Sequence, residues 1–202
     1  MQRSLVGSEM CIRDRSNIPY KIVGGVNFYA RKEIKDLLAY LKTIDNARDD
    51  LAVRRIINVP KRGIGATTLN RVADYAAAAD ISFYNALKMA DDIPTLGKSA
   101  AKIKPFVNFI QVMRSKVEII SVSELLQEII DETGYVKELE AEDTEEAKAR
   151  IENIDELISK VVAYEEGEEH PTLSGFLEEV ALVADIDSLD AVSYTHLRAH
   201  ET

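Results

Sequence analysis

The stretch Val59-Pro-Lys-Arg-Gly-Ile-Gly-Ala-Thr-Thr68 lies between two predicted helices and indicates a tight interhelical turn. Glycines on both sides of one aliphatic residue allow positive φ angles, and Ile64 is expected to anchor the turn to the core. The helix that follows begins with backbone N–H groups that lack intrahelical partners, and its dipole adds about half a positive charge there. We expect this turn to bind phosphate, as the hairpin of helix-hairpin-helix modules does.

The candidate DNA-binding residues belong to this turn and its neighbours. The lysine and arginine of the turn supply charge, and the two threonines supply hydroxyl donors. A second, weaker copy of the pattern is Leu96-Gly-Lys-Ser-Ala-Ala-Lys102, which adds one lysine. The predicted set is Lys61, Arg62, Gly63, Ile64, Gly65, Thr67, Thr68 and Lys98. Taken alone, a Gly-x-Gly between helices is more typical of an ordinary turn that binds nothing, and the neighbouring charges make the two interpretations about equal.

The segments on either side of the turn have helical patterns. Predicted helices cover residues 32–44, 51–58, 67–79, 82–90, 98–120, 121–133, 144–164 and 172–183. Pro105 is expected to kink or split the fifth of these, and Gly134 to end the sixth. Tyr20–Val23 is typical of a strand but has no partner elsewhere in the sequence. The expected fold class is therefore mainly α, with one short orphan strand from another domain.

Composition excludes several classes of protein. The 202 residues are 46% apolar and 30% charged, which suits one or two globular domains and rules out collagen-like or disulfide-stapled chains. No apolar run approaches the ~20 residues that a bilayer span needs, and Glu9 comes too early for a secretory signal. We therefore expect a cytoplasmic protein with no membrane partner.

Formal charge is divided unevenly along the chain. The net charge is −10, yet residues 16–116 hold 17 Lys or Arg against 9 Asp or Glu, whereas residues 117–190 hold 4 against 23. Because an acidic field repels phosphate, any contact with DNA is expected in the first, basic half. The acidic half is interpreted mainly as a solvated surface.

Both ends of the sequence are expected to be sequencing-adapter residues. DNA that encodes Val192–Thr202 can, when read as its reverse complement, encode Leu5–Asp14. We therefore set aside residues 1–15 and 191–202 and expect that neither natural terminus is present.

This exclusion removes most candidates for metal binding or nucleophilic catalysis. Cys11 is the only cysteine and lies in the first excluded segment, while His196 and His200 lie in the second. His170 remains, in a Glu-rich stretch, and is interpreted as a solvated loop residue. We predict no metal site in this chain.

From Ile18 to Asp190 the chain resembles superfamily 1 DNA helicases of the UvrD/PcrA/Rep type, closest to the PcrA branch. Many short matches occur in the same order along the sequence. They are Ile18–Gly25, Phe28–Asp36, Leu38–Leu41, Asp49-Asp50, Arg55–Gly65, Ser123–Leu126, Gly134-Tyr135 and Arg150–Glu156.

The resemblance implies that the parent protein unwinds DNA from 3′ to 5′ in repair or replication, using ATP and Mg²⁺. It places residues 16–31 at the edge of the RecA-like domain 2A and residues 32–190 in the helical 2B subdomain. It also implies that Gly63–Gly65 contacts duplex DNA ahead of the fork. The sequence has no G-x-x-x-x-G-K-S/T motif and no Asp-Glu pair after a buried strand. We therefore expect this chain alone to bind no ATP and to contain no catalytic residue.

Two other classes of function stay open. One is a free-standing, non-enzymatic helix-hairpin-helix module that binds duplex or forked DNA. The other is a protein-interaction domain whose acidic half docks a partner. Measuring duplex affinity against salt separates them, because phosphate binding weakens with a log-log slope of about 0.9 per phosphate neutralised.

Overall fold

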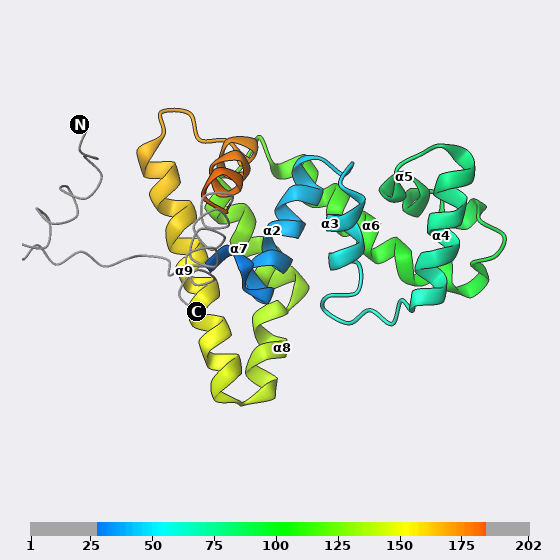
Figure 1. Cartoon of the computed structure of the whole chain (residues 1–202), viewed down its shortest axis with the longest axis horizontal. Coiled ribbons are helices and arrows are strands. Elements are labelled where there is room, and N and C mark those ends of the chain that lie inside the picture. The colour runs from blue at the N-terminus through cyan, green and yellow to red at the C-terminus, as the bar shows by residue number, and fades with distance from the viewer. Residues whose placement is uncertain (1–27, 185–202) are drawn as a thin grey trace, which may run out of the picture.

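The computed structural model describes residues 28–184, and this part of the chain is mainly α with no strand (Figure 1). The α-helices are α2 (Lys32–Asp45), α3 (Asp50–Ile56), α4 (Ala66–Ala79), α5 (Phe83–Lys88), α6 (Ala100–Lys116), α7 (Val122–Thr133), α8 (Tyr135–Glu142) and α9 (Glu145–Gly167). Short 3-10 helices are η1 (Phe28–Ala30), η2 (Ala90–Asp92) and η3 (Gly97–Ser99), and residues 173–184 are also helical. The predicted strand Tyr20–Val23 lies outside the described residues.

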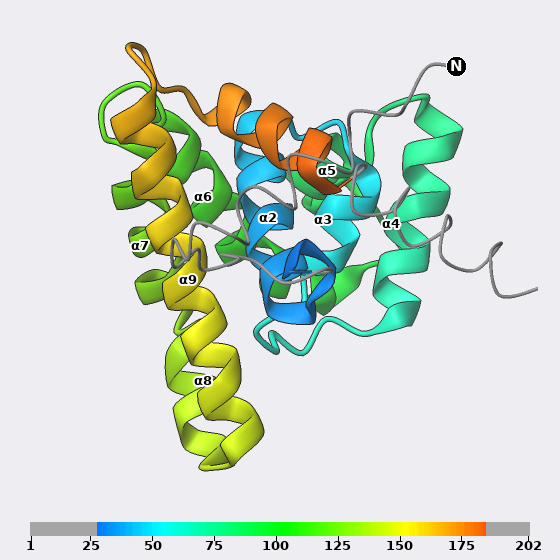
Figure 2. The same cartoon turned by 60° about the vertical axis from the view of Figure 1, so that its left-hand side comes forward.

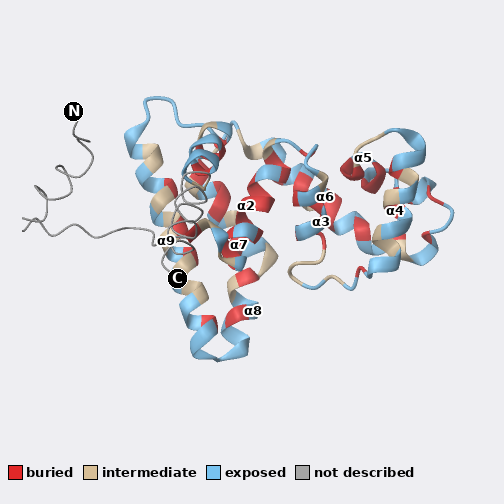
Figure 3. Cartoon of the chain, viewed as in Figure 1, coloured by how far each residue is buried: buried red, intermediate tan, exposed pale blue. Residues whose placement is uncertain are grey.

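Helix α2 forms the centre of the core. Its predicted apolar stripe from Ile34 to Ile44 is buried, and Tyr40 on the same helix is fully covered. A helix buried on more than one face needs partners on each side, and α2 contacts α3, α6, α7 and α9. Figure 3 shows this burial concentrated where the other helices meet α2.

The other helices lie on two sides of α2. Helices α3 to α6 form one side, and the turn between α3 and α4 lies at its lower edge in Figure 1. Helices α7 to α9 form the other side, where α8 packs against α9. Figure 2 shows α8 and the first half of α9 extending away from the rest. We call residues 135–152 the arm.

Local capping signals place most helix starts where the sequence predicts them. Asp49 accepts hydrogen bonds from two amides at the start of α3, and Ser82 accepts one from Asn85 at the start of α5. Ser121 forms the predicted capping box with Glu124, and Thr144 caps α9. None of the helices in the described part of the chain is both long and apolar enough to span a bilayer.

Two details differ from the sequence prediction. Pro105 lies inside α6, which continues unbroken from Ala100 to Lys116. The proline is the sixth residue of the helix, so its missing N–H costs one intrahelical bond, and the burial of Phe106 and Ile110 beyond it holds the helix in place. Helix α8 was not predicted, because it is short and mostly acidic and buries only Tyr135 and Leu139.

A buried carboxylate joins the two sides of the molecule. Asp36 on α2 is 1% exposed, and its carboxylate accepts hydrogen bonds from Arg55 Nε at 2.6 Å and from Tyr135 Oη at 2.9 Å. Next to it, Asn153 on α9 donates to Glu33 and accepts from Arg31. All of these residues lie in segments that carry the helicase resemblance. Those segments thus fix helix packing.

Candidate nucleic-acid interface

The turn between α3 and α4, residues 57–65, is called the elbow below. Gly63 has φ +67°, so this position needs a residue that tolerates the left-handed region. Gly65 has φ −82° and extended ψ, so its conformation suits any residue. Ile64 is 2% exposed and belongs to the hydrophobic core. The predicted anchor is therefore present, and one of the two glycines is required by its φ.

Asn58 organises the inner side of the elbow. Its side-chain oxygen accepts hydrogen bonds from the amides of Arg62, at 2.8 Å, and Ile64, at 3.3 Å. One asparagine thus satisfies two turn amides, much as an Asx turn does. These two amides are not free to bind a phosphate.

The start of α4 presents the open side of the elbow. Gly65 is the N-terminal cap residue and has no side chain to accept hydrogen bonds from the first turn. Within residues 28–184, no hydrogen bond is made by the amides of Gly65, Ala66 and Thr67, and all three residues are exposed. Thr68 lies one residue further along and is half-buried. This helix start therefore offers N–H groups to an anion.

The Arg62 side chain turns inward, away from this open side. Its Nη1 donates to the carbonyl oxygens of Ile56, at 2.9 Å, and Val59, at 3.2 Å. Its Nη2 donates at 2.6 Å to the hydroxyl of Tyr40, which itself donates to the Val59 carbonyl. The guanidinium also lies 5.4 Å from the centroid of the Phe106 ring. The structure therefore gives Arg62 a place in holding the elbow to α2 and α6.

Two lysines remain beside the open amides. Lys61 is exposed and forms no ion pair within residues 28–184. Lys102 on α6 places its Nζ 3.2 Å from the Gly63 carbonyl oxygen and is exposed. Lys98 lies one turn earlier, on η3, and makes no contact of this kind with the elbow. Of Lys98 and Lys102, the second is the one that contacts the elbow.

Sequence reasoning missed Asn58 and Lys102. Asn58 precedes the glycines by several residues, and only its paired hydrogen bonds reveal its role. Lys102 closes the weaker Leu96–Lys102 pattern, whose Gly97 has φ +49°. That glycine turns the chain into α6 and so places Lys102 beside the elbow. The pattern was therefore the available signal for Lys102.

Comparison with known proteins bears on the whole chain. Residues 12–193 match the family profile described as UvrD-like helicase C-terminal domain. The chain is 45% identical over 176 residues to the ATP-dependent DNA helicase PcrA of Bacillus subtilis, covering 87% of this chain and 24% of that protein. It is 44% identical over 178 residues to the PcrA helicase of Staphylococcus aureus, with the same coverage.

These relatives are much longer than the chain, which spans about a quarter of their length. The profile match and the identities nevertheless cover nearly all of the residues described above. The buried Asp36 network and the elbow both lie inside the matched region. The chain belongs to the family of the UvrD-like helicase C-terminal domain.

Proposed function

We propose that this chain is part of an ATP-dependent 3′ to 5′ DNA helicase and that its elbow binds the backbone of duplex DNA. The observation that carries the DNA contact is the set of unpaired amides at Gly65, Ala66 and Thr67, flanked by Lys61 and Lys102. Phosphate oxygens accept from helix N-terminal amides and gain from the dipole, whereas base edges play no part in such a contact. The names of the relatives support the parent activity.

The proposal also assigns the rest of the chain to domains of the parent helicase. Residues 32–190 form the helical 2B subdomain and residues 16–31 the edge of the RecA-like domain 2A. ATP and Mg²⁺ are bound elsewhere in the parent protein, and hydrolysis there supplies the energy for strand separation. The described residues bind and orient the duplex, and by doing so they regulate unwinding.

Arg62 and Ile64 act indirectly in this scheme. The Arg62 guanidinium donates to carbonyl oxygens and to the Tyr40 hydroxyl, and the Ile64 side chain is buried. Both residues therefore shape the elbow without contacting phosphate. The direct contacts are then the amides of Gly65, Ala66 and Thr67, the Thr67 and Thr68 hydroxyls, and the two neighbouring lysines. Lys98 adds long-range charge.

The amide contact is tested by adding a side chain at the cap position that binds the same amides. In Gly65→Asp the new carboxylate lies at the cap position, where such side chains accept from the amides two or three residues on. A Cβ at Gly65 meets no atom within 4 Å, so the fold accepts the change. We expect the affinity of the 202-residue chain for a forked duplex to fall by about tenfold or more, because the amides are occupied and the new charge repels phosphate.

Gly65→Ala is the matched control, because it adds a Cβ without an acceptor. We expect it to keep most of the duplex affinity, measured by fluorescence anisotropy at several salt concentrations. Thermal unfolding of both variants checks the fold, and Gly65→Asp should be at least as stable as the parent chain. If Gly65→Asp binds the duplex as tightly as the unaltered chain, the amides do not contact DNA. Absence of any duplex affinity in the unaltered chain would favour a protein-docking role instead.

A further inference from the structure

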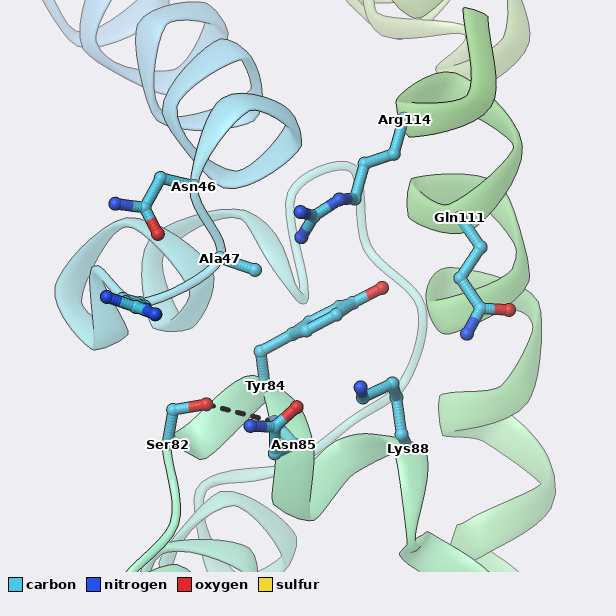
Figure 4. A pocket seen from close by; sticks show the side chains of 9 residues that line it. Asn46, Ala47, Ser82, Tyr84, Asn85, Lys88, Gln111 and Arg114 are labelled. Atoms are coloured by element: carbon cyan, nitrogen blue, oxygen red, sulfur yellow. Dashed lines mark hydrogen bonds between the residues drawn. The ribbon is translucent and has the colours of Figure 1, made fainter.

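A polar pocket lies where α2, α5 and α6 meet, away from the elbow. Its volume is about 460 Å³, which falls in the range of small-ligand sites. Three segments build it: the turn after α2, the helix α5 and the second half of α6 (Figure 4). The lining residues are Asn46, Ala47, Arg48, Ser82, Tyr84, Asn85, Lys88, Gln111 and Arg114.

The charge in this pocket is entirely positive. Arg48, Lys88 and Arg114 are cationic and exposed, and no carboxylate is among the lining residues. Within residues 28–184 neither guanidinium forms an ion pair or hydrogen bond. The Lys88 Nζ lies 5.7 Å from the centroid of the Tyr84 ring, which is a cation–π contact. Within residues 28–184 it forms no ion pair. Like charges held together in a hollow attract an anion.

Carboxylates close in sequence to the pocket are already used. Asp49 accepts from the amides of Leu51 and Ala52 at the start of α3. Asp50 accepts from the Phe83 amide at 2.9 Å, and this bond holds α5 against α3. Within residues 28–184 neither of these carboxylates forms an ion pair with a cation of the pocket.

Tyr84 provides an independent indication of a ligand site. It is 4% exposed, and its hydroxyl is the buried side-chain polar atom within residues 28–184 that lacks a hydrogen-bond partner. Figure 4 shows this hydroxyl pointing from α5 toward α6, between Arg114 and Gln111. Burial raises the pKa of the hydroxyl, while the charge of Arg114 opposes that rise. A buried hydroxyl without an acceptor is uncommon in folded proteins.

The pocket is separate from the elbow. The turn with Arg48 precedes α3, and the elbow follows α3, so the two sites lie at opposite ends of that helix. On α6, Lys102 contacts the elbow whereas Arg114 lines the pocket. Their separation along the helix is about 18 Å at a rise of ~1.5 Å per residue. One phosphate cannot occupy both sites.

We propose that this pocket is a second anion site, which binds the phosphate group of a nucleotide, either free or within a nucleic-acid strand. Arg48, Lys88 and Arg114 neutralise the phosphate, and the Tyr84 hydroxyl donates to one of its oxygens. The amides of Asn46, Asn85 and Gln111 supply uncharged donors and acceptors around it. This site does not depend on the role of the elbow in DNA binding.

The test is isothermal titration calorimetry of the 202-residue chain with pyrophosphate, ADP and a single-stranded oligonucleotide. Pyrophosphate should still bind when Gly65→Asp occupies the elbow amides, and Arg114→Gln and Lys88→Gln should each weaken this binding by about tenfold, as expected for loss of a charged hydrogen bond. Tighter binding of ADP than of pyrophosphate assigns the site to a free nucleotide. Displacement of pyrophosphate by the oligonucleotide assigns it to a strand.

Tyr84→Phe separates a ligand contact from a structural role. Its hydroxyl has no partner in the fold, so removing it should leave the unfolding midpoint unchanged or higher. The same change should weaken pyrophosphate binding several-fold. Lys148→Gln on the arm is the matched control and should leave pyrophosphate binding intact. The proposal is overturned if pyrophosphate and ADP do not bind, or if Arg114→Gln and Lys88→Gln bind them as the unaltered chain does.

Discussion

The elbow has two charged residues, Lys61 and Arg62, and the arm has many, and the two regions use their charges in opposite ways. At the elbow, Arg62 is half-buried and its donors meet carbonyl oxygens of Ile56 and Val59 and the Tyr40 hydroxyl. On the arm, the ion pairs Lys148–Glu145 and Arg150–Glu146 join residues of a single helix, and their glutamates are 90% and 77% exposed. The contacts of Arg62 hold distant segments together, whereas the ion pairs of the arm lie on the surface of one helix.

Net charge along the sequence therefore does not show which charged side chains are free to bind a ligand. The basic half of the chain contains Arg62 and Arg55, whose guanidinium groups bind other parts of the protein. Lys61 and Lys102 carry the same formal charge and remain exposed. The following predictions test this contrast between fixed and free charge.

Arg62→Ala should have the largest effect on stability. It removes the guanidinium that donates to the carbonyl oxygens of Ile56 and Val59 and to the Tyr40 hydroxyl, and we expect the free energy of unfolding to fall by about 2–3 kcal/mol. Urea denaturation followed by circular dichroism measures it. Lys61→Ala is the matched control and should change stability by less than about 0.5 kcal/mol. Equal losses for the two variants would mean that Arg62 does not hold the elbow.

Tyr135 should make the stability of the chain fall at alkaline pH. Burial, and then the Asp36 carboxylate that accepts from it, raises the pKa of its hydroxyl above the ordinary value. The folded state therefore keeps the proton that the unfolded state releases. The stabilisation is complete below about pH 10 and is lost above it, at about 1.4 kcal/mol per pH unit for one tyrosine.

Tyr135→Phe isolates this contribution. The free energy of unfolding, measured in urea between about pH 9 and 12, should fall less steeply with pH by roughly 1.4 kcal/mol per unit. Tyr40 and Tyr84 also have raised pKa values, so part of the alkaline loss should remain. An unchanged slope in Tyr135→Phe would show that this hydroxyl does not remain protonated in the folded state.

Gly63 and Gly134 provide a smaller test at two positions with the same φ angle. Both have φ +67°, but a Cβ at Gly63 lies 3.4 Å from Lys102 Nζ, whereas one at Gly134 meets nothing within 4 Å. Alanine at either position should cost about 1–2 kcal/mol, because a Cβ is strained in the left-handed region. Only Gly63→Ala should also weaken duplex binding, since it disturbs the elbow. Anisotropy titrations and urea denaturation of both variants provide the comparison.

Most of the helical fold could be predicted from the sequence, because its signals are local. The stripe of α2 and the capping residues Asp49, Ser121 and Thr144 each act within one or two turns. The arm shows the limit of such signals. Helix α8 buries only Tyr135 and Leu139, so its periodicity is too short to detect.

The candidate sites were less predictable, because their geometry depends on contacts between distant residues. Whether Arg62 points outward or inward is decided by Tyr40, which lies 22 residues earlier. Lys102 reaches Gly63 across 39 residues. The pocket around Tyr84 joins three segments, and no spacing in the sequence marks it. Residue type identified the elbow, but only packing shows which of its groups remain free.

Lys148→Gln on the arm should have the smallest effect. Its partner Glu145 is 90% exposed, and an exposed pair within one helix contributes about 0.3–0.5 kcal/mol at low salt. We expect a loss of stability below about 0.5 kcal/mol, and this loss should disappear at high salt, because screening removes the attraction. Urea denaturation at two salt concentrations measures both effects. A loss of unfolding free energy as large as that of Arg62→Ala would contradict this distinction between the elbow and the arm, because it would mean that the charges of the arm also hold the fold together.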